Sequence, residues 1–91
     1  PRICIMSHKE MIHTTAVVHS TAVVEEGATL HEGVRVWHFS HVRASAVLNR
    51  GVSIARDVYV DADIELGEYS RIQNGVSVYK GVQIGPWCFV G

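Results

Sequence analysis

The stretch AVLNRGVSIARDVYVDADIEL, residues 46–66, carries an aliphatic side chain at every sixth position. Leu48, Ile54, Val60 and Leu66 mark this period. An α-helix would place successive members of the series about 600° apart and spread them around its axis. The strands of a sandwich or barrel would need hairpin turns and longer alternation. A period of six favours neither fold, and it indicates short strands that each end in a tight corner.

The same period runs through nearly the whole chain. In steps of six from Ile12, every position is Ile, Leu or Val, and chance would produce this with a probability on the order of 10⁻⁷ to 10⁻⁸. These positions are Ile12, Val18, Val24, Leu30, Val36, Val42, Leu48, Ile54, Val60, Leu66, Ile72, Val78, Ile84 and Val90. A second inward position follows each by four residues and holds Ala16, Ala22, Ala28, Val34, Ser40, Ala46, Val52, Val58, Ile64, Ser70, Val76, Val82 and Cys88.

A third position of the repeat predicts the corners. Three residues after an aliphatic, glycine or aspartate recurs, and both tolerate a positive φ. This corner slot holds Gly27, Gly33, Gly51, Asp57, Asp63, Gly75 and Gly81. Three sides of six residues make a coil of 18, and coils stack at the inter-strand spacing of roughly 4.8 Å. We therefore predict an all-β fold, a parallel β-helix of a little over four coils.

Length and composition limit the number of domains and the classes of partner. The chain has 91 residues, 47 % of them hydrophobic, and a net charge of −1. We expect one domain, with a cap or edge strand over residues 1–11 and the β-helix over 12–91. Scattered basic residues argue against a nucleic-acid partner, and no apolar run reaches the length of a membrane span. Cys4 and Cys88 lack metal-ligand spacing, so free thiols in a reducing cytoplasm are expected.

Residues 18 apart should stack, so each corner displays a column of side chains. We name them the His38 corner (Ser20, His38, Arg56, Asn74), the Arg50 corner (Thr14, Glu32, Arg50, Glu68) and the Ala44 corner (Glu26, Ala44, Ala62, Lys80). The Arg50 corner predicts a surface ion ladder, which contributes roughly 0–1 kcal/mol per pair and needs no function. The Ala44 corner looks featureless.

The His38 corner concentrates the chemistry. It is flanked by Trp37, His41, Tyr59, Gln73 and Ser77. Arg56 suits a phosphate or carboxylate, and the aromatic side chains suit stacking. Aromatic and arginine side chains are also enriched at subunit interfaces, so this edge is either a ligand groove, an interface, or both. The other histidines read as surface residues, and no metal site is expected because converging ligands are missing.

Three segments, residues 12–18, 34–42 and 71–82, resemble the N-acetyltransferases of bacterial surface-polysaccharide synthesis. They read Ile-His-Thr-Thr-Ala-Val-Val, Val-Arg-Val-Trp-His-Phe-Ser-His-Val and Arg-Ile-Gln-Asn-Gly-Val-Ser-Val-Tyr-Lys-Gly-Val. Such enzymes transfer acetyl from acetyl-CoA to UDP-2-acetamido-3-amino-2,3-dideoxy-glucuronate or to similar nucleotide-linked amino sugars. The resemblance covers residues 12–91.

The resemblance implies a left-handed coil and a homotrimer with active sites between neighbouring β-helices. Together with Arg56 from the stacking, it gives the predicted substrate-binding set Trp37, His38, His41, Arg56, Gln73, Asn74 and Tyr79, while the catalytic residues stay unassigned. Two departures concern this set. The family usually has Gln-Asn-Asn where this chain has Gln73-Asn74-Gly75, and Gln-Asn where it has Arg56-Asp57.

Three functions remain open from the sequence. The family continues for several more coils, which carry most of the acetyl-CoA surface, so an N-acetyltransferase fragment that is weak or inactive alone is the first. A non-catalytic trimeric binding or structural module is the second. A hexapeptide protein similar to carbonic anhydrase, with zinc between subunits, is the third.

Overall fold

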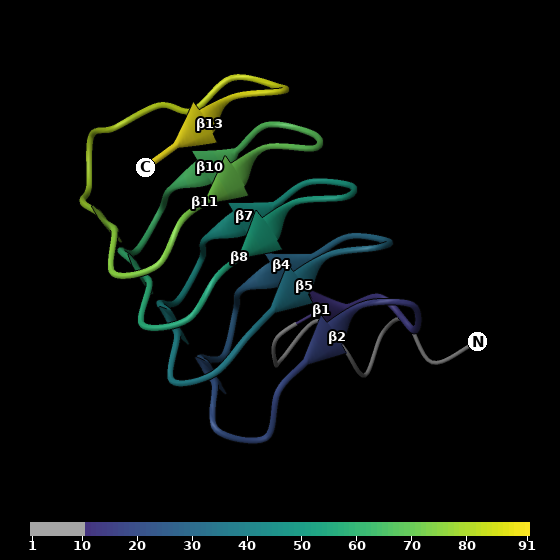
Figure 1. The fold of residues 1–91 in the computed structure, drawn as a ribbon. Coiled ribbons are helices and arrows are strands. Elements are labelled where there is room, and N and C mark those ends of the chain that lie inside the picture. Colours follow the sequence, from purple (N-terminus) through teal and green to yellow (C-terminus); the bar gives the residue numbers. More distant parts are fainter. Residues whose placement is uncertain (1–10) are drawn as a thin grey trace.

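The computed structural model describes residues 11–91 as a stack of triangular coils (Figure 1). Each side of a coil carries a strand of two residues, except the side at Ile84, which forms an isolated bridge to Leu66. The strands are β1 (Met11–Ile12), β2 (Val17–Val18), β3 (Val23–Val24), β4 (Thr29–Leu30), β5 (Arg35–Val36), β6 (His41–Val42), β7 (Val47–Leu48), β8 (Ser53–Ile54), β9 (Tyr59–Val60), β10 (Glu65–Leu66), β11 (Arg71–Ile72), β12 (Ser77–Val78) and β13 (Phe89–Val90).

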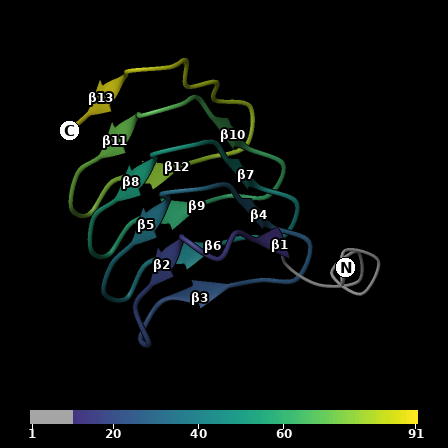
Figure 2. The ribbon, with the colours of Figure 1, turned by 90° about the vertical axis from the view of Figure 1, so that its right-hand side faces the viewer.

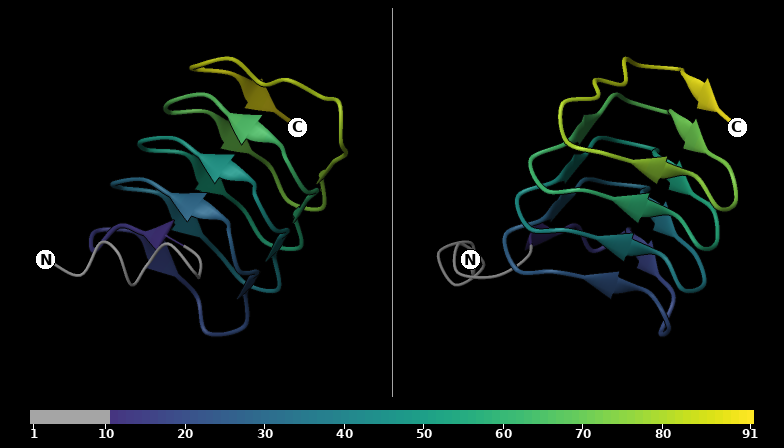
Figure 3. Two further views of the ribbon diagram at one scale, coloured as in Figure 1. Left: turned by 180° about the vertical axis from the view of Figure 1, so that it is seen from behind. Right: turned by 90° about the vertical axis from the view of Figure 1, so that its left-hand side faces the viewer.

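The strands pair in parallel into three sheets, one for each side of the triangle (Figure 2). Sheet 1 has the order β1-β4-β7-β10, sheet 2 the order β13-β11-β8-β5-β2, and sheet 3 the order β12-β9-β6-β3. Arg35 pairs with Ser53 and Ser53 with Arg71, so the register advances by one full coil at each step. The views from behind and from the other side show the same regular stack (Figure 3). The predicted all-β, left-handed parallel β-helix is confirmed.

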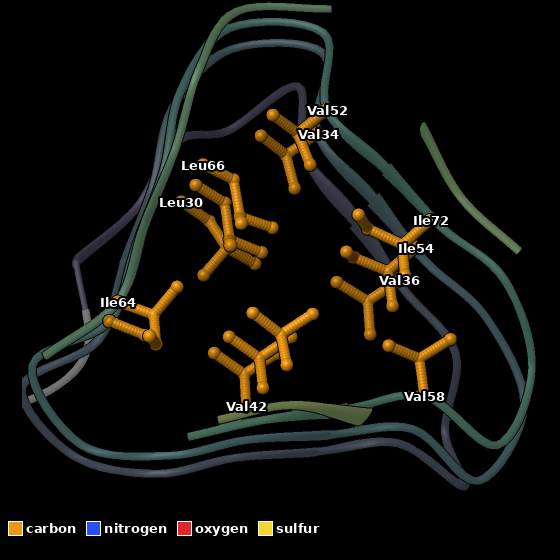
Figure 4. Close-up of a cluster of buried hydrophobic side chains, with 14 of the residues drawn as sticks. Leu30, Val34, Val36, Val42, Val52, Ile54, Val58, Ile64, Leu66 and Ile72 are labelled. Carbon is orange, nitrogen blue, oxygen red and sulfur yellow. The ribbon is translucent and has the colours of Figure 1, made fainter. Parts of the chain in front are cut away.

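The interior is a column of aliphatic side chains that fills the triangle (Figure 4). From Leu30 to Val78, every position of the six-residue series is buried. The second inward series is buried from Ala28 to Ser70, but its last two members, Val82 and Cys88, are exposed. These two positions belong to the last coil, and they are exposed because no described coil stacks on them.

Two inward serines show how a polar group is tolerated in this column. Ser40 Oγ donates to the carbonyl of Ala55 at 2.5 Å and accepts the N–H of Val58 at 3.2 Å. Ser70 makes the same pair of contacts to the next coil, donating to Gly85 at 2.6 Å and accepting the N–H of Cys88 at 3.3 Å. A buried hydroxyl that both donates and accepts avoids the free-energy cost of an unsatisfied polar group.

The corner slot has a positive φ in every coil from residue 27 onward. The glycines and aspartates predicted for this slot all have it, and four other side chains share it: Phe39, Ser45, Tyr69 and Trp87. A bulky residue in this conformation costs roughly 1–2 kcal/mol relative to an ordinary backbone. Most of these residues donate their N–H across the coils, as Asp57 does to the carbonyl of His38 at 3.0 Å.

The predicted cap or edge strand over residues 1–11 lies, except for Met11, outside the described residues. Met11 belongs to β1 and pairs with Thr29. The β-helix is continuous from there to Gly91 (Figure 1).

Candidate functional site

An open groove of about 340 Å³ runs along the His38 corner. It is lined by Trp37, His38, Ala55, Arg56 and Asn74. Four of the seven predicted site residues therefore meet here, on three successive coils. The stacking of one coil on the next brings them together, because consecutive coils lie roughly 4.8 Å apart.

The backbone of this corner is fixed by contacts between coils. Asp57 donates its N–H to the carbonyl of His38, and Gly75 donates to the carbonyl of Arg56, both at 3.0 Å. Asn74 Oδ1 accepts the N–H of Arg56 at 3.2 Å. The amide NH₂ of Asn74 is then the group that can donate to a ligand.

The guanidinium of Arg56 is held only weakly. Its Nε lies 3.8 Å from Asp57 Oδ2, and the Arg56 side chain is 61 % exposed. A surface pair of this kind contributes little. Arg56 can therefore turn toward an anion that enters the groove.

Two groove-side residues were missed by the sequence analysis. His19 packs its ring on that of His38, with centroids 3.8 Å apart, and the N–H of Thr21 donates to His19 Nδ1. Phe39 sits in the corner slot with φ 57°, is 62 % exposed, and has its ring centroid 6.4 Å from that of His38. His19 belongs to the column next to that of His38, so the 18-residue spacing alone does not predict that their rings meet. Phe39 stands where glycine or aspartate was expected.

The other three predicted residues lie outside the groove lining. Gln73 is exposed and its N–H donates to the carbonyl of Val90 at 2.8 Å. His41 lies on β6, and Tyr79 follows β12; both are on the sheet 3 side, where Tyr59 stands between their rings at centroid distances of 5.9 and 6.0 Å. Their part in a site stays a prediction.

His41 belongs instead to a polar network beside the Ala44 corner. Its Nε2–H donates to Glu25 Oε2 at 2.6 Å, and Arg43 Nε donates to Glu25 Oε1 at 3.2 Å. Arg43 also donates to the hydroxyl of Tyr59 at 2.8 Å and lies 3.8 Å from Asp61. The side chains of this network belong to the column Glu25, Arg43 and Asp61, one residue before the Ala44 corner column. The sequence analysis did not single out this column, although its charges alternate in sign.

Hydrogen bonds in and around this network lower the pKa of two carboxyl groups, those of Glu25 and Asp61. The hydrogen bond from His41 lowers the pKa of Glu25 below its ordinary 4.5, against the opposing effect of burial, and Arg43 and the N–H of Ala44 lower it further. The N–H groups of Ala62 and Lys80 lower the pKa of Asp61. Both carboxylates are thereby favoured in the ionised form.

The lowered pKa of Glu25 predicts a loss of stability in acid. A carboxyl group whose pKa is lower in the folded state stabilises the fold above its unfolded value and loses that contribution as the pH falls through the folded value. We expect the thermal midpoint to drop as the pH falls below the ordinary carboxyl value of 4.5 and through the lowered pKa of Glu25, and Glu25→Gln to remove part of this drop. Thermal melts followed by circular dichroism check this. Glu26→Gln is the control and should keep the full drop; an equal drop in the Glu25→Gln protein would contradict the prediction.

The Arg50 corner carries part of the predicted ion ladder. Arg50 Nε lies 3.8 Å from Glu32 Oε1, with both side chains more than half exposed. Hydrogen bonding to Tyr69, followed by the charges of Glu32 and Glu68, raises the pKa of the Arg50 guanidinium. The pair is a solvated surface contact.

Two kinds of feature are absent from residues 11–91. In this range, no group of three or more His, Cys, Asp or Glu side chains is arranged to hold a metal ion. Within the same range, no helix has the length and apolar character to cross a bilayer.

Comparisons with known proteins place the fold. No protein-family model and no curated protein matches the chain. Among solved structures it is similar to two histidine mutants of GDP-perosamine N-acetyltransferase from Caulobacter crescentus in complex with CoA and GDP-perosamine. The alanine mutant has 22 % identity and a TM-score of 0.71, and the asparagine mutant has 19 % and 0.56. Each match covers 92 % of this chain and 49 % of the other.

A third structure is more distant. The acetyltransferase domain of PglB from Neisseria gonorrhoeae FA1090, in complex with acetyl coenzyme A, matches with 17 % identity and a TM-score of 0.37 over 90 % of this chain and 51 % of that one. This likeness is too weak to build on. The two Caulobacter structures share the β-helix fold of this chain, which spans about half of their length.

Proposed function

We propose that this chain is part of an acetyl-CoA-dependent N-acetyltransferase that acts on a nucleotide-linked amino sugar. The groove of the His38 corner supports this most directly, because it sets the weakly paired guanidinium of Arg56 between aromatic and amide side chains. The fold is shared with a transferase crystallised with CoA and GDP-perosamine. The segments at 34–42 and 71–82 resemble enzymes that use UDP-linked 3-amino sugars in surface-polysaccharide synthesis.

The residues of the groove divide the work of binding the sugar nucleotide. Arg56 pairs with the diphosphate, for which a guanidinium is well suited. Trp37 and the exposed ring of Phe39 stack on the base or the sugar. Asn74 donates its amide NH₂ to a ligand oxygen, since its Oδ1 is already occupied by the N–H of Arg56. The ring of His38 is held in place by His19.

The proposed reaction is the attack of a free amine on the thioester carbonyl of acetyl-CoA. The amine nitrogen forms the new C–N bond, the C–S bond breaks, and the proton that the nitrogen loses passes to the departing thiolate, so that CoA leaves as the thiol. Alignment of the two reactants lowers the barrier by several kcal/mol. A general base is needed only for an amine that arrives protonated. We propose a cytoplasmic homotrimer that completes the site between neighbouring subunits, and we expect weak transfer by these 91 residues alone because they span about half of the similar structures.

Arg56 provides the test. A lost charge-assisted contact costs at least about 1.5 kcal/mol, so Arg56→Ala should weaken the binding of UDP by about tenfold. Isothermal titration calorimetry measures the affinity, and light scattering measures the oligomeric state, which should stay trimeric. Arg50→Ala on another corner is the matched control and should bind UDP normally. Unchanged binding by the Arg56→Ala protein, or its dissociation to monomers, would show that this edge is not the substrate groove.

A further inference from the structure

Two arginines on the outer face of sheet 2 have no ion-pair partner among residues 11–91. Arg35 on β5 and Arg71 on β11 stack in register with Ser53 between them. The other basic side chains of this range, at positions 43, 50, 56 and 80, all lie within 4 Å of a carboxylate. Sheet 2 therefore displays a column of positive charge that the fold itself does not neutralise.

Aromatic rings line the corner next to this column. Tyr69 and Trp87 occupy corner slots with φ near 60°, where the same column holds Gly33 and Gly51 in earlier coils. Their rings stack with centroids 4.7 Å apart and planes 18° apart. On the sheet itself, Phe89 pairs in register with Arg71 and is 68 % exposed.

The ring of Tyr69 packs against the backbone of the coil before it, and the ring of Trp87 packs on Tyr69. Tyr69 covers the notch at Gly51, because a Cβ built there would lie 2.3 Å from Tyr69 Cδ1. Trp87 has a positive φ, and 74 % of its surface is exposed although its ring stacks on Tyr69. Residues in strained backbone conformations are found preferentially at binding sites.

These side chains form a single groove. It has a volume of about 360 Å³ and is lined by Gly51, Tyr69, Arg71, Trp87, Cys88 and Phe89. Aromatic faces stack on nucleobases, and guanidinium groups bind phosphate. Arg35 lies two coils below Arg71, roughly 10 Å away, and both side chains are long enough to converge on one phosphate group.

We propose that this sheet 2 groove is a second ligand site, which binds a nucleoside phosphate. The base stacks against Trp87 and Phe89, and the phosphates lie on Arg71 and Arg35. The groove is on a different corner from His38, and the proposal does not depend on the function proposed for that corner. A nucleoside without phosphate loses the arginine contacts, and inorganic pyrophosphate loses the stacking.

Tryptophan fluorescence reports on this groove once Trp37 is removed. In the Trp37→Phe chain, Trp87 is the one remaining tryptophan. Titration with ADP should quench it to saturation, with adenosine binding at least tenfold more weakly and pyrophosphate giving no quenching. Adding Arg71→Ala should weaken ADP binding about tenfold, whereas Lys80→Ala, a control on another corner where Lys80 pairs with Asp63, should not. Adding Arg56→Ala should leave the response intact, which separates this groove from the His38 corner.

A second variant separates binding from folding. Trp87→Gly restores the residue found in the slot at positions 33 and 51, so its thermal midpoint should stay equal to that of the parent or rise. Its affinity for ADP, measured by calorimetry in the Arg56→Ala background, should fall at least tenfold. A lower midpoint with unchanged ADP affinity would show that the ring serves the fold. Unchanged ADP affinity after Arg71→Ala, or a change of oligomeric state, would equally overturn the proposal.

Discussion

The Gly67→Ala substitution is expected to lower the free energy of unfolding by about 2–3 kcal/mol. A Cβ at this position would lie 2.4 Å from the carbonyl carbon of Gly85 and 2.4 Å from the nitrogen of Pro86. These are backbone atoms, which cannot rotate out of the way as a side chain can. The coil that carries them would have to move outward and weaken the hydrogen bond from the N–H of Gly67 to the carbonyl of Ile84, now 2.8 Å.

Gly85→Ala is the matched control for this prediction. Gly85 follows an aliphatic residue of the repeat, as Gly67 does, and lies one coil farther on. A Cβ there meets no atom within 4 Å, and its φ is not positive. We expect its free energy of unfolding to change by less than about 0.5 kcal/mol. Denaturant unfolding followed by circular dichroism compares the two proteins, and equal effects would mean that the coils are not stacked as described.

The fold could be predicted from the sequence because one period decides it. Burial of Leu48, Ile54, Val60 and Leu66 follows from their spacing alone, since each repeat unit makes one side of the triangle. The position of the corners followed as well, from the glycines and from Asp57. Regular repeats make such predictions strong, because each coil contacts only its neighbours in the same register.

The corner residues with bulky side chains could not be predicted. Propensity places glycine or aspartate in a positive-φ slot, so Phe39, Tyr69 and Trp87 were not expected there. The backbone of neighbouring coils imposes the conformation on whatever residue occupies the slot. These exceptions are informative, because all of them lie beside the proposed grooves.

The contacts of long side chains also could not be predicted from the sequence. Residues 18 apart stack along the backbone, but their side chains can contact the next column. His41 hydrogen bonds to Glu25, whose own column continues at Arg43. The ring of His19 packs on that of His38 from the neighbouring column. Side chains lean across columns to find charge and aromatic partners, and spacing does not specify the direction. From the sequence, His41 was predicted to belong to the His38 corner, whereas in the structure it hydrogen bonds to Glu25.

The proposed substrate groove depends on His38 and Arg56 being neighbours on adjacent coils. Coils roughly 4.8 Å apart place such residues within the Cα separation of about 4.4–6.8 Å that a disulfide tolerates. A pair that is closer in the sequence, such as His38 and Arg50, lies on two different corners. Disulfide formation therefore discriminates the three-sided coil from any other arrangement.

The decisive measurement is oxidation of a chain that carries His38→Cys and Arg56→Cys, with Cys4→Ser and Cys88→Ser to remove the native thiols. The extent of intramolecular disulfide, measured by mass spectrometry after mild oxidation at low protein concentration, should approach completion. The control chain with His38→Cys and Arg50→Cys should form almost none. Little disulfide in the 38/56 chain, or as much in the control, would contradict the three-sided coil and with it the groove.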